Sequence, residues 1–122
     1  MASIAFTIPR EEGTGDHSKE LVQALTEGEI GKSVHDRRRA HGFDRIKVWQ
    51  QESPRLTIVY LEAADLDAAI QALAADEHEH NRWVLEKIEK ITGRNPKDHE
   101  GRPSTRLLVD WHAEKGHSAT HH

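Results

Sequence analysis

The chain has 122 residues, of which 35% are hydrophobic and 31% are charged, and this length predicts one domain with a single core. Its 17 Lys and Arg residues against 21 Asp and Glu residues give a net charge of −4, which argues against nucleic acid or an anionic membrane as a general partner. The chain has no cysteine, which excludes disulfides, thiolate nucleophiles and cysteine-bound metal centres, and it has no signal-like start or long apolar run, so we expect a cytoplasmic protein.

The first half of the chain predicts a strand, a broken helix and a second strand. Residues 3–8 alternate apolar and small side chains, which is typical of a strand. A helix follows, and we expect it to break where its apolar stripe slips at Gly28 and Gly31, since each glycine costs a helix about 1 kcal/mol. Gly42 is suited to end the second piece in the left-handed conformation. Residues 43–51 then predict an edge strand with one wetter face.

The third strand, residues 56–61, is apolar on both faces and therefore needs a cover on each. Helices of so short a chain supply one cover, and a second copy of the same sheet is the simplest source of the other, which predicts a homodimer. Asp65 is expected to cap the next helix, and Asp76 to start another that ends at Gly93. Residues 105–111 predict the last strand.

This order of elements, βαββαβ, predicts an α+β fold of the ferredoxin-like type, with a four-stranded antiparallel sheet and helices on one face. In that topology the first and third strands are central and the second strand is an edge. We expect residues 1–112 to form the single domain and residues 113–122 to be a disordered tail that contains histidines.

Histidine is the unusual residue of this chain, with ten copies. His41 and His80 fall on the inward sides of their predicted helices, and His78 lies beside His80. Imidazole titrates near neutral pH and also binds transition metals, so these rings are candidates for a general base or a metal site. The candidate metal ligands are His35, His78 and His80. Against a metal, residues two apart on a helix diverge, and no HExxH pair exists, so solvated or capping histidines remain the alternative.

Three aromatic residues and one arginine are candidates for contacts with a substrate. Tyr60 and Trp83 stand at positions where large side chains fill a core, although either ring could stack on a planar ligand. Trp49 lies on the polar face of an edge strand, which indicates a dimer contact or the rim of a pocket. Arg38 points inward and so needs an anion. The candidates for that anion are Glu62, Asp110 and a substrate carboxylate.

Three stretches resemble the dimeric α/β-barrel superfamily, and within it the antibiotic-biosynthesis-monooxygenase type: VYLE at 59–62, LDAAIQAL at 66–73 and DEHEH at 76–80. The segment 81–93 also resembles small, uncharacterised ferredoxin-like domains of actinobacteria. The resemblance implies a homodimer whose two sheets face one another, with a pocket between sheet and helices in each subunit. Members of the superfamily include cofactor-independent oxygenases, cyclases, isomerases and haem-degrading enzymes.

We therefore expect a small-molecule enzyme that needs no cofactor and uses a histidine base on an aromatic or polyketide-like substrate, as an oxygenase, cyclase or isomerase. The catalytic candidates are His80, His78 and Tyr60. The substrate-binding candidates are Trp49, Trp83, Arg38 and His41. Two alternatives remain open: a protein that binds a transition metal or haem through histidine, and a non-catalytic dimer that binds a small ligand or only assembles.

Overall fold

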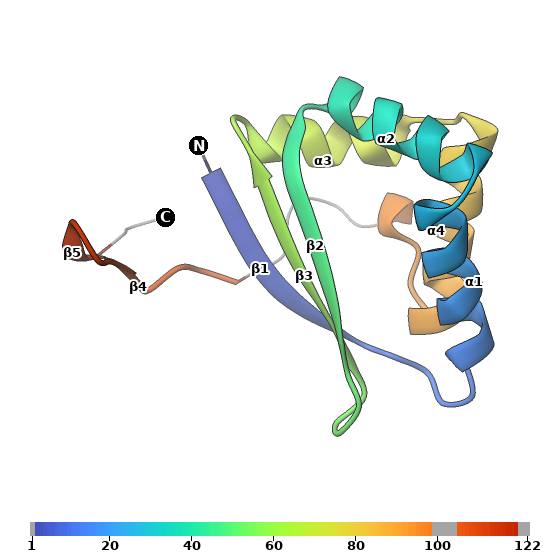
Figure 1. The fold of residues 1–122 in the computed structure, drawn as a ribbon, viewed down its shortest axis with the longest axis horizontal. Coiled ribbons are helices and arrows are strands. Elements are labelled where there is room, and N and C mark those ends of the chain that lie inside the picture. The colour runs from blue at the N-terminus through green and yellow to red at the C-terminus, as the bar shows by residue number, and fades with distance from the viewer. Residues whose placement is uncertain (1, 99–104, 120–122) are drawn as a thin grey trace.

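A three-stranded antiparallel sheet and a layer of helices form the body of the protein (Figure 1). The computed structural model describes residues 2–98 and 105–119, and within these ranges the fold is α+β, as the order of elements predicts. The elements in chain order are β1 (Ala2–Pro9), α1 (Gly15–Thr26), α2 (Glu29–His41), β2 (Phe43–Gln51), β3 (Leu56–Ala63), α3 (Leu66–Ala75), α4 (Glu79–Thr92), a short 3-10 helix η1 (Pro96–Asp98), β4 (Val109–His112) and β5 (Gly116–Ala119).

The strand order of the sheet is β1-β3-β2, so β3 is central and β2 is an edge, as predicted. The expectation for β1 is wrong for the described residues, because β1 lies at the opposite edge and not in the centre. Central Leu61 pairs with Ile4 on one side and with Ile46 on the other. The sheet thus has two edges, and the fourth strand that would cover β1 is not beside it.

The last strand forms a separate hairpin instead of completing the sheet. Strand β4 pairs with β5, from Val109 opposite Ala119 to His112 opposite Gly116, and Figure 1 shows this hairpin projecting away from the helices. A hairpin closes a short loop, whereas pairing with β1 joins segments about a hundred residues apart, and loop-closure entropy favours the first. The segment expected as a disordered tail, 113–122, therefore contains β5; residues 120–122 lie outside the described ranges.

The helical layer breaks where the sequence predicts. Helix α1 ends before Gly28, which has a φ of 104°, and α2 begins at Glu29. A side chain on Gly31 would collide with the carbonyl oxygens of Leu25 and Ala24, so this glycine lets the start of α2 approach the end of α1 closely. Left-handed Gly42 and Gly93 end α2 and α4, and Asp65 caps α3 through a 3.1 Å bond from the backbone amide of Ala68, all as predicted.

A polar contact joins α1 to α4. Helix α1 itself has no fully buried side chain. The ammonium group of buried Lys87 binds the carboxylate of Glu20 and lies 3.1 Å from Nδ1 of His17. The hydrogen bond and the charge of Lys87 lower the pKa of Glu20. Half-buried Trp83 lies beneath the same ammonium group, 5.7 Å from its ring centre, which fits the packing role considered for this residue.

The main core lies at one end of the sheet, where α3 packs against it. Its buried members are Ile4, Phe43, Leu61, Ala63, Leu66 and Ala69. Farther along the same face, Val48 of β2 stays 62% exposed. On the outer face of the sheet, which the helices do not cover, Ile58 and Tyr60 are half-buried and Trp49 is 50% exposed (Figure 1). The third strand thus presents apolar side chains to both faces, but only one face has a partial cover.

No helix within residues 2–98 and 105–119 combines the length and the apolar character needed to cross a membrane.

Candidate functional site

An open groove of ≈ 930 Å³ lies within the helical layer. One wall is the face of α2 from Glu29 to His41, and the other is the end of α3 with residues 76–80, which lead into α4. The groove therefore differs in place from the expected pocket, which was to lie between sheet and helices. Half of the residues that line the groove are charged. The carboxylates are Glu29, Asp36, Asp76, Glu77 and Glu79, and the cations are Lys32 and Arg37.

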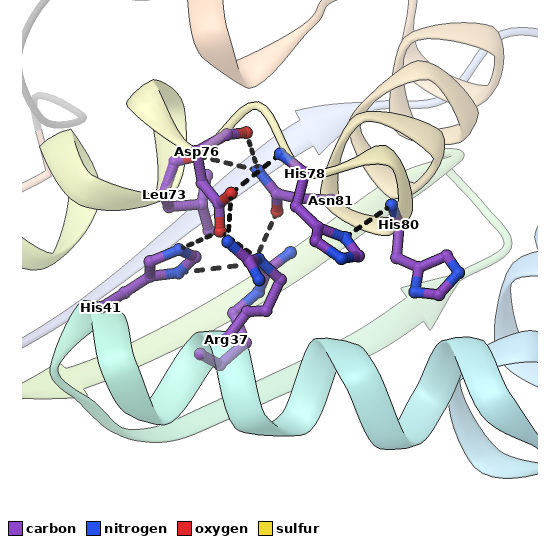
Figure 2. Close-up of polar contacts among 8 residues, drawn as sticks. Arg37, His41, Leu73, Asp76, His78, His80 and Asn81 are labelled. Atoms are coloured by element: carbon purple, nitrogen blue, oxygen red, sulfur yellow. Dashed lines mark hydrogen bonds and ion pairs between the residues drawn. The ribbon is translucent and has the colours of Figure 1, made fainter.

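The carboxylate of Asp76 ties the two walls of the groove together (Figure 2). Arg37 of α2 binds it with two nitrogens: Nε lies 2.5 Å from Oδ2 and Nη2 lies 2.8 Å from Oδ1. His41, one turn further along α2, places Nε2 2.8 Å from Oδ2, and the backbone amide of His78 donates to Oδ1 at 3.0 Å. The Arg37 guanidinium, helped by the His78 amide and His41, holds the pKa of Asp76 well below its usual range. Asp76 is therefore an ionised anchor between α2 and the α3–α4 connection.

Fully buried Asn81, in the first turn of α4, completes this anchor. Its Nδ2 donates to the carbonyl oxygens of Leu73 and Asp76 at 3.0 and 2.8 Å, and its Oδ1 accepts from Nη1 of Arg38 at 2.7 Å. Arg38 points inward, as predicted, but it binds this amide rather than Glu62 or Asp110. Burial lowers the pKa of Arg38 to about 10, although the charge of Asp76 opposes that shift. We call Arg37, Arg38, His41, Asp76 and Asn81 the Asp76 cluster.

His78 and His80 form a pair of rings on the groove wall at the start of α4. The ring centres lie 5.0 Å apart, and Figure 2 shows both rings projecting toward α2. The divergence expected for helical residues two apart does not occur, because His78 is the N-cap and lies outside the helix. Its Nδ1 accepts from the backbone amide of His80 at 3.1 Å, so a neutral His78 carries its proton on Nε2.

One nitrogen of His80 is buried without a partner. The Nδ1 atom of this ring is buried and makes no hydrogen bond with any of the described residues. Its other nitrogen, Nε2, lies 3.8 Å from Oε1 of Glu79, whose side chain is exposed. Leaving a buried polar atom unpaired costs about 1–3 kcal/mol, so packing alone does not explain the position of this ring on the groove wall.

Of the residues singled out from the sequence, the groove gathers His41, His78 and His80. Tyr60 lies on the outer face of the sheet, where its hydroxyl donates to Glu62 at 2.6 Å and this bond raises its pKa. Trp49 shares that outer face, and neither residue lines the groove.

The three candidate metal ligands do not come together in the described part of the chain. His35 is exposed on α2 and is not among the groove residues. Within residues 2–98 and 105–119, no three or more His, Cys, Asp or Glu side chains are grouped so that they could hold a metal ion. The arrangement is suited to hydrogen bonding and proton transfer.

Sequence reasoning missed Arg37 and Asn81 and took Asp76 only as a helix-capping residue. A signal for Arg37 exists, because it lies four residues before His41 and such residues share one face of a helix. No comparable signal marks Asn81, whose partners are backbone carbonyls and an arginine 43 residues away.

Comparison of the chain with family models, with curated proteins and with solved structures finds no match. The fold defines a small α+β protein with antiparallel sheets, and the groove with its histidine pair is the feature that argues for a function.

Proposed function

We propose that this protein binds a small polar molecule in the groove between α2 and the start of α4 and transfers a proton on it, with His80 as the base. The observation that carries the proposal is the pair of rings that His78 and His80 place on the groove wall, with one nitrogen of His80 free of any hydrogen bond to the described residues. Imidazole is suited to this task because it exchanges a proton near neutral pH. His78, whose Nδ1 is engaged by a backbone amide, presents Nε2 as a hydrogen-bond donor to the same molecule.

The character of the walls favours an isomerase or a cyclase over an oxygenase. A cofactor-free reaction with oxygen calls for a dry, enclosed pocket, whereas this groove is open and lined by charged side chains. Isomerisation and aldol-type cyclisation need a base and a group that stabilises an enolate oxygen. Lys32 on the α2 wall offers that positive charge, and Ser33 offers a hydroxyl donor.

The same walls favour a polyketide-like substrate with adjacent carbonyls over a polycyclic aromatic one. None of the three tryptophans, Trp49, Trp83 and Trp111, lines the groove, so no indole is available there to stack on a large planar ring. A 1,3-dicarbonyl unit matches the polar walls, and the C–H between its carbonyls is acidic enough for an imidazole base.

The proposal is tested by exchange of the acidic C–H of 1,3-dicarbonyl compounds in D₂O, followed by proton NMR with the full chain. We expect the protein to accelerate exchange for part of such a panel, and His80→Asn to lower this acceleration by about 100-fold, a typical contribution of a general base. His35→Asn is the matched control, because His35 is exposed outside the groove, and it should leave the rate unchanged. Equal loss in both variants, or no acceleration by the protein, would overturn the proposal.

We further propose that the chain assembles as a homodimer, as one ferredoxin-like half of a dimeric α/β barrel. The outer face of the sheet supports this, since half-exposed Trp49 lies there beside the half-buried side chains of Ile58 and Tyr60. Light scattering at micromolar concentration should give twice the mass of the chain, and a single-chain mass would refute the homodimer.

A further inference from the structure

The two edges of the sheet differ in how they are protected. Strand β2 carries Asp44, Arg45 and Lys47 and has a register irregularity between Phe43 and Arg45, and such charges and bulges discourage pairing with other strands. Residues 2–8 of β1 contain no charged side chain and no proline. Among the described strands, only β3 pairs with β1. The edge of β1 is therefore open to a further strand.

The C-terminal arm, residues 105–119, has the complementary property. It carries the β4–β5 hairpin, and Leu108, Val109 and Trp111 on it are 67%, 60% and 61% exposed. Val109 and Trp111 are two residues apart in a strand and so share one face. Figure 1 shows the arm extending away from the helical layer. An apolar strand face of this kind, held outside a core, is typical of a surface that binds a partner.

We propose that the arm of each chain packs along the β1 edge of a second copy, so that two copies exchange their arms. This inference rests on the homodimer proposed above and adds how its two chains are joined. The arm supplies the fourth strand expected from the sequence, and β1 of the partner then becomes a central strand.

A second copy explains more of the exposed apolar surface than the chain's own arm does. An arm that folded back on its own β1 would cover that edge but would leave Trp49, on the outer face near β2, exposed. A second copy covers the edge with its arm and the outer face with its sheet, and two-fold symmetry provides each contact twice. Stable protein interfaces bury roughly 1,200–2,000 Å², and the arm and the outer face together offer more surface toward that range than the arm alone.

Because the chain has no cysteine of its own, a thiol-specific crosslinker reacts only at a cysteine that is introduced. Two single variants of the full chain, Thr7→Cys on β1 and Val109→Cys on the arm, are mixed and treated with a short bis-maleimide, and products are identified by mass. We expect the mixed dimer of the two variants to form at least tenfold faster than the mixed product of Thr7→Cys with Thr26→Cys, a control at the end of α1. Trp111→Ser should raise the dimer dissociation constant at least tenfold.

The outcomes separate the arm from the homodimer. If the wild-type chain stays monomeric, both the homodimer and the exchange of arms are refuted. A dimer that forms no mixed crosslink, while a chain carrying both cysteines crosslinks within itself, shows that the arm completes its own sheet; this overturns the exchange and leaves the homodimer standing.

Discussion

At the scale of single residues, Asp76 connects the groove to the rest of the helical layer. Its carboxylate binds Arg37 and His41 from one helix and the backbone amide of His78 from the connection to another. These contacts orient the chain just before the histidine pair. The position of His80 opposite α2 therefore depends on a carboxylate that need not touch the bound molecule.

Replacing Asp76 by Asn should lower the free energy of unfolding by about 2 kcal/mol, less than the 3–5 kcal/mol of a fully buried pair because the Arg37 side chain is partly exposed. The change removes the negative charge and leaves Arg37 without its ionic partner. Urea unfolding at pH 7 measures the loss. Asp44→Asn, at an exposed carboxylate, is the control and should change stability by less than about 0.5 kcal/mol.

The same carboxylate predicts how stability depends on pH. Its pKa is lower in the folded chain than in the unfolded chain, so its stabilisation is complete above the unfolded value of about 3.9 and is lost as pH falls toward the folded value. The unfolding free energy should therefore fall between about pH 4 and pH 2, and less steeply in Asp76→Asn than in the wild type. Parallel curves for the two proteins would contradict this role of Asp76.

Sequence patterns predict the direction of a side chain in this cluster from its neighbours on the same helix, but they do not predict contacts between helices. The inward directions of His41 and Arg38 follow from helical spacing and are confirmed. The bond between Arg37 and Asp76 joins positions 39 residues apart, and helical periodicity carries no information over that separation. The nearest neighbours of Asp76 therefore indicate only a helix start at this residue, whereas α4 begins at Glu79 after the N-cap His78.

At the scale of elements, the corner between α1 and α2 depends on Gly31. Alanine in a helix is normally more stable than glycine by about 1 kcal/mol. Here its methyl group would meet the backbone carbonyls of Leu25 and Ala24, and backbone cannot move aside as a side chain can. We expect Gly31→Ala to destabilise the protein by about 1–3 kcal/mol, as overpacking does, in urea unfolding. Gly15→Ala, where the added carbon meets no atom within 4 Å, should be neutral or stabilising, and a stabilised Gly31→Ala would refute the close approach.

Local signals predict the elements of this chain better than their pairing. The helix break at Gly28, the helix end at Gly93 and the cap at Asp65 each depend on a signal within a few neighbouring residues, and all three are confirmed. The sequence predicts residues 105–111 as a strand but carries no information on which strand it joins. Its pairing with β5 closes a short local loop, whereas pairing with β1 needs contacts between segments about a hundred residues apart, on which a local pattern carries no information.

At the scale of the whole molecule, the two exposed faces of β2 allow the proposed assembly to be tested. Trp49 and Val48 are neighbours on one strand, both at least half exposed, but their side chains point to opposite faces of the sheet. Trp49→Lys, on the outer face, should raise the dimer dissociation constant at least tenfold, because it places a charge in the proposed interface. Val48→Lys is the matched control and should leave that constant unchanged in analytical ultracentrifugation. If both variants raise the dimer dissociation constant equally, the outer face of the sheet is not the interface.

The hydrogen bond from the backbone amide of His78 to Asp76 also allows the opening of one wall of the groove, the α3–α4 connection, to be measured. This amide exchanges its hydrogen with water only when the 3.0 Å bond opens, which requires the carboxylate to move away from the start of α4. Its exchange rate, read by NMR, reports how often this turn of the α3–α4 connection opens. A bound dicarbonyl compound that bridges the two walls should slow this one amide more than the amides of the distant β2–β3 hairpin.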